Sequence, residues 1–343
     1  MSDSLLPYAV GAANRARRVA VRMRRRVERL HTAPAFASGI RPRPALKAVH
    51  LSVLGGRTLN VALLAPPAVD VTAARLEFAR GGRHHRLDLD VEPQGDGTRL
   101  LTATTALRYT DRTDLPDSPG DHGPGRAGVA LAGGLWRIGV VLTGADGREV
   151  RAGVGAVALP ATDGPTAPVS PSPDSGAHFR IMRSVDGFAV LKVRAPVHQA
   201  ELDRFDLRWD RIVVHGRLIG RQGPTSAYTA QAVRRGGGTV VQAAPLEWEG
   251  DSFTFDVPLA EMVAGGRSYR WDMQLQHGRT GLKIGRRLTD VRRRHQVIRT
   301  TFRIIALEDG TLLRAHAYIT SAGALAVSCV AFEGAPDGAE EVA

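Results

Sequence analysis

Cysteine, aromatic side chains and long apolar runs are all scarce in this sequence. One cysteine among 343 residues excludes a disulfide framework and a thiolate-rich zinc site, and we expect no disulfide-linked partner. The longest mainly apolar stretch, residues 127–145, is interrupted by Arg137 and several glycines, so we expect no membrane-spanning helix. The N-terminus lacks the apolar segment of a signal peptide. We therefore expect a cytoplasmic chain, soluble or attached peripherally to the inner face of the plasma membrane.

The positive charge is concentrated at one end of the chain. The formal net charge is +12, and residues 1–45 hold ten arginines against only two acids, Asp3 and Glu28. Four acids lie in residues 333–343, which we expect to form an acidic disordered tail. With 43% hydrophobic residues, the rest of the chain is apolar enough to fold, and its length allows two domains.

Residues 1–33 are predicted to form a basic amphipathic arm. Apolar residues recur at helical spacing from Val19 to Leu30, arginines fill most of the other positions, and Pro34 ends the pattern. Such a helix can lie in a membrane interface with its arginines on anionic headgroups. The residues expected to contact that surface are Arg15, Arg17, Arg18, Val19, Arg22, Met23, Arg24, Arg25, Arg26, Val27, Arg29 and Leu30.

Two other uses of the arm stay open. A solvated or protein-docked basic helix has the same pattern, and so does a nucleic-acid-binding helix. Nucleic acid ranks last because no aromatic residue is interleaved with the arginines to stack on bases.

Proline-rich segments divide the remaining chain. Residues 34–45 and 161–176 are rich in proline and small residues and are predicted to be linkers. The domains are then expected at residues 46–160 and 177–332.

Both domains show the period of β-strands. Leu59, Val61 and Leu63 alternate with other residues, as do Phe253, Phe255 and Val257, and glycine-containing turns separate such runs. The fold class is therefore all-β: two tandem immunoglobulin-like antiparallel β-sandwiches behind the basic helix. The segments opening at Leu76 and at Ala230 follow the same order of elements, which indicates an internal repeat. Trp136 and Trp271 are expected to be core anchors, and Tyr269 has the spacing of a tyrosine corner.

A second basic cluster lies late in the chain, around a predicted loop between two strands. Clustered guanidiniums attract phosphate or carboxylate polymers and can bind them bidentately, although a solvated basic loop would have the same composition. This candidate polyanion-binding loop comprises Lys283, Arg286, Arg287, Arg292, Arg293, Arg294, Arg299 and Arg303.

The second domain resembles a known group of modules. The segments that carry the resemblance are Arg211–Leu218, Phe253–Leu259, Tyr269–Met273 and Leu313–Val327, with Tyr318, Thr320, Gly323 and Leu325 in the closing strand pair. Their order is similar to the accessory β-sandwich regions of actinobacterial teichoic-acid-type glycosyltransferases and glycerophosphotransferases. The transferase domain and catalytic histidine pair of those enzymes are missing, so the resemblance implies the non-catalytic module.

The sequence offers no catalytic, cofactor-binding or metal-binding motif. Cys329 lies on the apolar face of its predicted strand, as a structural thiol would. Glu247 and Glu249 flank Trp248 and could bind or cleave a sugar, but solvated charges are the simpler interpretation.

We therefore expect a non-catalytic accessory protein of teichoic-acid-type polymer synthesis. Its expected partners are an anionic membrane surface and either a cell-wall polymer synthase or the anionic glycopolymer, with no cofactor. Two rivals stay open: a glycosyl- or glycerophosphotransferase acting on an activated donor, and a nucleic-acid-binding protein that uses the arm.

Overall fold

The computed structural model describes residues 45–111, 128–156, 164–167, 169–243, 245–263, 268–308 and 310–332. The arm (residues 1–33), the linker up to residue 44 and the acidic tail (residues 333–343) lie outside these residues, so what we expect of them stays a prediction. The chain divides into two compact units. Unit 1 comprises Met1–Ala161 and Ala177–Ala195, and unit 2 comprises Thr162–Gly176 and Pro196–Ala343.

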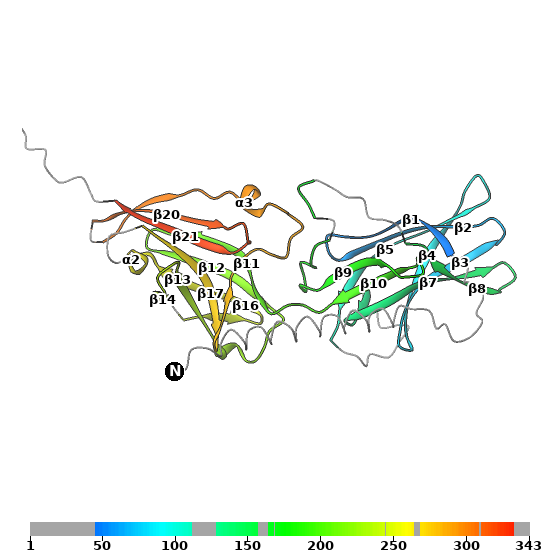
Figure 1. Ribbon diagram of the computed structural model, residues 1–343, viewed down its shortest axis with the longest axis horizontal. Coiled ribbons are helices and arrows are strands. Elements are labelled where there is room, and N and C mark those ends of the chain that lie inside the picture. The colour runs from blue at the N-terminus through cyan, green and yellow to red at the C-terminus, as the bar shows by residue number, and fades with distance from the viewer. Residues whose placement is uncertain are drawn as a thin grey trace, which may run out of the picture. The chain divides into compact units, whose positions relative to one another are not determined.

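Unit 1 is built of strands (Figure 1). They are β1 (Ala45–Leu54), β2 (Thr58–Ala65), β3 (Val71–Arg80), β4 (Arg83–Pro93), β5 (Arg99–Tyr109), β6 (Val129–Leu131), β7 (Gly134–Gly144), β8 (Glu149–Val154), β9 (His178–Arg183) and β10 (Ala189–Arg194).

The strands of unit 1 close into a ring rather than forming two separate sheets. The order β3-β4-β5-β2-β1-β8-β7 returns to its start because β3 also pairs with β7. Two strands change partners along their length to join the sheets: β1 pairs first with β8 and then with β2, and β4 pairs first with β3 and then with β5. The β1–β8 and β5–β6 pairs are parallel, whereas a purely antiparallel sandwich was expected.

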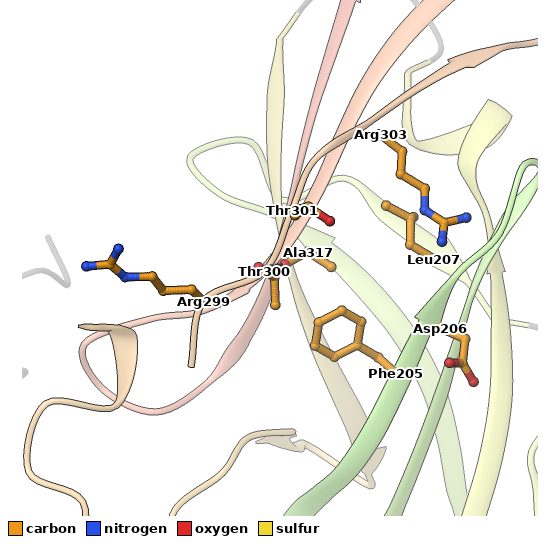
Figure 2. Close-up of a pocket in the computed structure, with 8 residues that line it drawn as sticks. All are labelled: Phe205, Asp206, Leu207, Arg299, Thr300, Thr301, Arg303 and Ala317. Atoms are coloured by element: carbon orange, nitrogen blue, oxygen red, sulfur yellow. Dashed lines mark hydrogen bonds between the residues drawn. The ribbon is translucent and has the colours of Figure 1, made fainter. Parts of the chain in front are cut away.

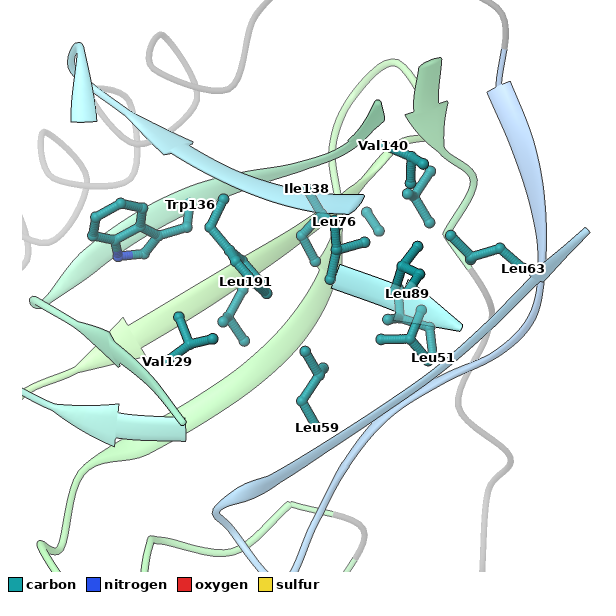
Figure 3. Close-up of a cluster of buried hydrophobic side chains, with 14 of the residues drawn as sticks. Leu51, Leu59, Leu63, Leu76, Leu89, Val129, Trp136, Ile138, Val140 and Leu191 are labelled. Carbon is teal, nitrogen blue, oxygen red and sulfur yellow. The ribbon is translucent and has the colours of Figure 1, made fainter. Parts of the chain in front are cut away.

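The core of unit 1 lies inside this ring. In Figure 3, Leu51 and Leu59 of β1 and β2 point toward Ile138 of β7 and Leu191 of β10. Trp136 is 1% exposed, and its indole N–H donates to the carbonyl of Ala132 at 2.9 Å. The indole is thus a core anchor, as predicted, with its one polar group satisfied.

Unit 2 is also built mainly of strands, and it contains three short helical turns (Figure 1). The strands are β11 (Gln199–Leu207), β12 (Arg211–Ile219), β13 (Tyr228–Arg234), β14 (Val240–Gln242), β15 (Glu247–Glu249), β16 (Ser252–Pro258), β17 (Tyr269–His277), β18 (Thr280–Lys283), β19 (Arg303–Ala306), β20 (Leu312–Ile319) and β21 (Leu325–Phe332). The helical turns are η1 (Thr225–Ala227), α2 (Leu259–Met262) and α3 (Arg294–Val297).

Two sheets enclose the core of unit 2. One has the order β11-β12-β16-β15, and the other has the order β14-β13-β17-β21-β20-β19, with β18 paired to β17. Phe253 and Phe255 of the first sheet and Met273 and Val327 of the second belong to one buried cluster. Trp271, 2% exposed, donates its indole N–H to the carbonyl of Met262 at 3.0 Å, which confirms the second predicted anchor.

The repeated segments occupy matching places in the two units. β3 pairs antiparallel with β7, which carries Trp136, and β13 pairs antiparallel with β17, which carries Trp271. The last arginine of each first strand lies near an aromatic ring of its neighbour: Arg80 over Trp136 and Arg234 over Tyr269. The order of elements therefore repeats, as the sequence indicated.

The predicted domain boundary is wrong in its position. We expected residues 177–332 to form the second domain, but β10 hydrogen-bonds to β7, and β9 pairs with β10, so both strands extend unit 1. Residues 164–167 and 169–176 of the predicted linker belong to unit 2, where Ser170 and Ser172 are buried. The Arg217 guanidinium donates to the carbonyls of Pro173 and Asp174 there.

The described residues contain no helix that is both long and apolar enough to cross a membrane.

Candidate polyanion-binding site

Lys283 of the predicted basic cluster is the last residue of β18, and the other seven residues lie on the segment 284–303 of unit 2, which we call the cationic loop. It follows β18, includes α3 and ends at the first residue of β19. At the start of the loop, the N–H of Ile284 donates to the carbonyl of Met273 in β17, and the carbonyl of Ile284 accepts from the N–H of Leu325 in β21. The next residue, Gly285, exchanges hydrogen bonds with Ala200 and Leu202 of β11. The loop is therefore fixed between β11, at the edge of one sheet, and β17 and β21 of the other.

Only glycine fits at position 285. A Cβ atom built there would lie 2.0 Å from the carbonyl oxygen of Gly323 and 2.8 Å from the Cα of Ala324. Both neighbours are backbone atoms, which cannot rotate away as a side chain could. The close approach holds the loop against β21.

A buried carboxylate holds the next turn of the loop. Glu201 of β11 is 5% exposed and accepts hydrogen bonds from the N–H groups of Arg287 and Leu288, each at 3.0 Å. Burial raises the pKa of the Glu201 carboxyl, and the two N–H donors together with Arg217 and Arg286 only partly offset this. Because the carboxylate bonds to backbone rather than to guanidiniums, it orients the loop and leaves the arginine side chains for other partners.

Three of the predicted residues are engaged within the protein. The ammonium of Lys283 lies 2.7 Å from a carboxylate oxygen of Asp272, and the same carboxylate forms an ion pair with Arg235. Arg287 is half-buried, and desolvation lowers the pKa of its guanidinium. Arg294 is also half-buried and donates to the carbonyl of Arg287 at 3.4 Å. Their positive charges are thus compensated or turned inward.

The other five predicted arginines are exposed. No carboxylate among the residues that the structure describes forms an ion pair with them, and only Arg299 makes a side-chain hydrogen bond, to the carbonyl of Gln296. They are Arg286, Arg292, Arg293, Arg299 and Arg303. The loop therefore presents uncompensated positive charge on a fixed backbone.

The former linker segment supports the same loop. Thr166 forms a β-bridge with Val291. The N–H of Ala167 donates to the backbone carbonyl of Asp290, and the N–H of Arg292 donates to the carbonyl of Pro165. The cationic loop is thus held from the linker side as well as from the sheet side.

A groove borders the end of the cationic loop, and we call it the edge groove. It has a volume of about 410 Å³ and lies between β11 and the residues that lead into β19. In Figure 2 the Arg303 side chain extends toward Leu207 and Asp206, whereas Arg299 points away from them. Its lining residues are Phe205, Asp206, Leu207, Arg299, Thr300, Thr301, Arg303 and Ala317.

The edge groove combines three kinds of binding group. Arg299 and Arg303 can donate to phosphate or carboxylate oxygens. Phe205 supplies an apolar surface inside the groove, whereas Asp206, the next residue of β11, points toward the opposite face of the strand and can accept hydrogen bonds from hydroxyl groups at the border of the groove. Thr300 is already engaged, since its hydroxyl donates to the carbonyl of Ala317. A ligand with both anionic and hydroxyl groups matches this lining best.

One polar group on the outer face of β11, β12 and β16 has the composition of a catalytic triad. His215 lies 3.6 Å from Asp206 through Nε2 and 3.0 Å from the hydroxyl of Thr254 through Nδ1. Arg204 approaches the same Nε2 at 3.4 Å, so this side of the ring faces both a guanidinium donor and the Asp206 carboxylate.

Neither Cys329 nor the two glutamates beside Trp248 form part of the cationic loop or the edge groove. Burial raises the pKa of the Cys329 thiol to about 12, which opposes a nucleophilic role. Glu247 and Glu249 are exposed on β15, while the Trp248 ring between them packs on Phe253 and Tyr228. The carboxylates and the indole therefore face opposite sides of the strand. Within the described residues, no group of three or more acidic, histidine or cysteine side chains could hold a metal ion.

Sequence reasoning missed the residues that hold the site in place. Glu201 stands between Ala200 and Leu202, which are both buried, and an acid inside an apolar run was the available signal. Phe205 and Asp206 also went unrecognised, because their proximity to Arg303 arises from the packing of two sheet edges that are distant in sequence.

Comparison with known proteins places the chain in no family. No protein-family model matches it, and no curated protein matches it significantly. Among solved structures, a crystal structure of S. aureus TarS 217–571 is 9% identical, with 70% of this chain and 61% of that chain covered and a TM-score of 0.27. A second S. aureus TarS structure is 10% identical, covering 62% of this chain and 35% of that chain, with a TM-score of 0.29.

Pullulanase type I from Bacillus subtilis str. 168, complexed with maltose, is 12% identical, covering 71% of this chain and 24% of that chain, with a TM-score of 0.17. The chain thus spans less than two thirds of the TarS structures that it matches. TM-scores this low support no argument about fold or function.

Proposed function

We propose that this protein is a non-catalytic binding protein of cell-envelope synthesis. In this proposal, the cationic loop and the edge groove bind an anionic glycopolymer of the teichoic-acid type, or the synthase that carries it. The two β-rich units form the frame, and the arm attaches the protein to the inner surface of the plasma membrane.

The observation that carries the proposal is the exposed charge of a fixed loop. Five guanidiniums without an acidic partner in the described residues project from a backbone held by Gly285 and Glu201. Because the backbone is already ordered, binding loses little conformational entropy there. Guanidiniums bind phosphates bidentately, so a chain of phosphodiesters is a suitable ligand.

The edge groove favours a polyol or sugar phosphate over other polyanions. Asp206 would repel a ligand made of phosphates alone, but it accepts hydrogen bonds from hydroxyl groups. Phe205 offers an apolar face for the carbon skeleton between phosphates.

A charge-neutralised variant tests the loop. We expect R292Q/R299Q/R303Q to bind a synthetic glycerol-phosphate oligomer at least tenfold more weakly than the original chain, because a hydrogen bond to a charged group contributes about 1.5–3 kcal/mol. Isothermal titration calorimetry at several salt concentrations measures both the affinity and its salt dependence.

The matched control is R148Q/R183Q/R279Q, which removes three exposed charges outside the cationic loop and the edge groove. An equal loss of affinity in the loop variant and in the control would show that net charge alone determines binding. Unchanged affinity in the loop variant would reject the loop as the site. Tighter binding to duplex DNA than to the oligomer, steeply salt-dependent and lost when residues 1–33 are removed, would favour the nucleic-acid alternative.

The arm has its own test. We expect the full chain to sediment with anionic vesicles and the chain lacking residues 1–33 to bind less, since each basic residue near an anionic surface contributes about 1 kcal/mol. Equal sedimentation of both chains would reject membrane attachment by the arm. It would not affect the proposal that the cationic loop binds the polymer.

A further inference from the structure

An apolar patch lies on the outer face of the seven-stranded sheet of unit 2. Four large apolar side chains there are Phe302 (50% exposed), Ile304 (63%), Leu312 (39%) and Phe332 (42%). Single exposed apolar residues are ordinary on protein surfaces, but a contiguous group marks a binding surface. We call these four residues the apolar patch.

The strand register shows that the patch is contiguous. Leu312 pairs with Phe332 across β20 and β21, and Ile304 of β19 pairs with Arg314 of β20. Side chains at paired positions lie about 5 Å apart on the same face. This face is the outer one, because the alternate residues Leu313 and Ala315 belong to the buried core.

Positive charge borders the patch. Arg314 lies on the same face, with its guanidinium 4.1 Å from the centre of the Phe302 ring. Arg270 of β17 is exposed opposite Ser328 of β21, Arg299 is exposed on the cationic loop, and no ion pair with a described carboxylate involves these three arginines. Among the described residues, the exposed acid closest in sequence is Glu308, in the turn between β19 and β20, and in the sequence Asp309 and Glu333 also flank the patch.

We propose that the apolar patch is a second membrane contact, which inserts into the interface of a bilayer rich in anionic lipid. Aromatic and aliphatic side chains partition into the boundary between headgroups and acyl chains, and neighbouring arginines bind anionic headgroups. The exposed face of a sheet edge presents these groups to a planar surface. Since one weak anchor gives only reversible attachment, the patch and the arm together would hold the chain on a membrane more firmly than the arm alone.

This inference does not depend on polymer binding by the edge groove. The four apolar side chains lie on the outer face of the sheet and none of them lines the groove, which lies between the edges of the two sheets. Only Arg299 belongs to both surfaces.

A fluorescent label at the patch tests the contact directly. Cys329 is buried and its thiol is protonated at neutral pH, so a cysteine introduced by I304C can be labelled selectively with an environment-sensitive dye. The control is V185C, at a residue that is 79% exposed in unit 1. With phosphatidylglycerol-containing vesicles, we expect a blue shift and protection from an aqueous quencher at position 304 and neither at position 185.

Two results would overturn the proposal. The first is sedimentation of the labelled chain with vesicles while the dye at position 304 stays accessible to the quencher, because the arm alone would then bind. The second is a blue shift that rises with protein concentration without vesicles, because a second copy of the chain would then cover the patch.

Affinity provides an independent measurement. We expect F302S/I304N to lower the partition coefficient of the full chain onto anionic vesicles at least about tenfold. The control V185N/V197N makes similar changes at exposed valines outside the patch and should leave partition unchanged. An equal partition coefficient for F302S/I304N and the original chain, with equal melting temperatures, would reject the patch.

Discussion

The Glu201 carboxylate is the residue on which the shape of the cationic loop most depends. It is buried and accepts hydrogen bonds from the N–H groups of Arg287 and Leu288. We expect E201A to lower the free energy of unfolding by about 1–3 kcal/mol, because those donors lose their partner. Chemical denaturation measures this loss. The control E249A removes an exposed acid and should change stability by less than about 0.5 kcal/mol.

The same substitution separates stability from binding. If Glu201 orients the loop, E201A weakens binding of the glycerol-phosphate oligomer although it removes a negative charge from a cationic site. Tighter binding by E201A would show that net charge, rather than a fixed backbone, determines affinity.

Asp272 gives a prediction with a defined pH dependence. Burial alone would raise the pKa of this carboxyl, but hydrogen bonds from Arg235 and Lys283 outweigh burial and leave it below the ordinary value of 3.8. A lowered folded-state pKa contributes stability above the ordinary pKa, and this stability is lost as the pH falls through the folded-state value. We therefore expect D272N to cost about 1–3 kcal/mol at pH 7 and progressively less below pH 4.

Thermal melts of D272N and of the original chain between pH 7 and pH 3 check this. The control D146N changes an acid in an exposed turn. A difference between D272N and the original chain that stays constant down to pH 3 would contradict the assignment of ion-pair stability to Asp272.

At the scale of elements, alternation predicted strands well and could not predict which strands meet. The buried and half-buried residues of β2 and β16 alternate throughout, as the sequence indicated. The turns could also be predicted from their glycines, because some turn positions need a positive φ that other residues rarely adopt. Gly147, for example, has a φ of 74°. The pairing of β10 with β7, by contrast, depends on packing across residues far apart in sequence, and composition does not encode it.

The candidate site shows the same division. Composition located the eight basic residues, but it could not separate the exposed Arg303 from Lys283, whose charge Asp272 compensates. Residues 161–176 were predicted to be a linker because proline and serine are frequent in flexible chains. Packing against unit 2 overrides that preference, since Ser172 is only 2% exposed.

The packed state of this segment can be tested with one charge. We expect S172D to lower the free energy of unfolding by about 2 kcal/mol or more, because an unpaired carboxylate would be buried. S321D places the same charge at an exposed serine in a turn of unit 2 and should have little effect. Equal melting temperatures for the two variants would restore the interpretation of residues 164–176 as a flexible linker.

At the scale of the whole molecule, the two units are interleaved along the chain. Unit 1 needs residues 177–195, which follow a segment belonging to unit 2. β9 and β10 contribute Phe179, Ile181 and Leu191 to the core of unit 1, and Leu191 lies opposite Trp136 in the register of β10 and β7. Burying each such side chain stabilises the fold by about 1.5–3 kcal/mol.

Fragments that end on either side of these strands test the boundary. We expect residues 1–195 to unfold in one cooperative transition with a blue-shifted tryptophan emission, because Trp136 is covered. Residues 1–176 would lose more core than a marginally stable domain can spare, and we expect red-shifted emission and aggregation. Adding a peptide of residues 177–195 to the shorter fragment should restore the blue shift if β9 and β10 dock on β7. Equal cooperativity and emission in the two fragments would place the boundary back at residues 161–176 and assign β9 and β10 to unit 2.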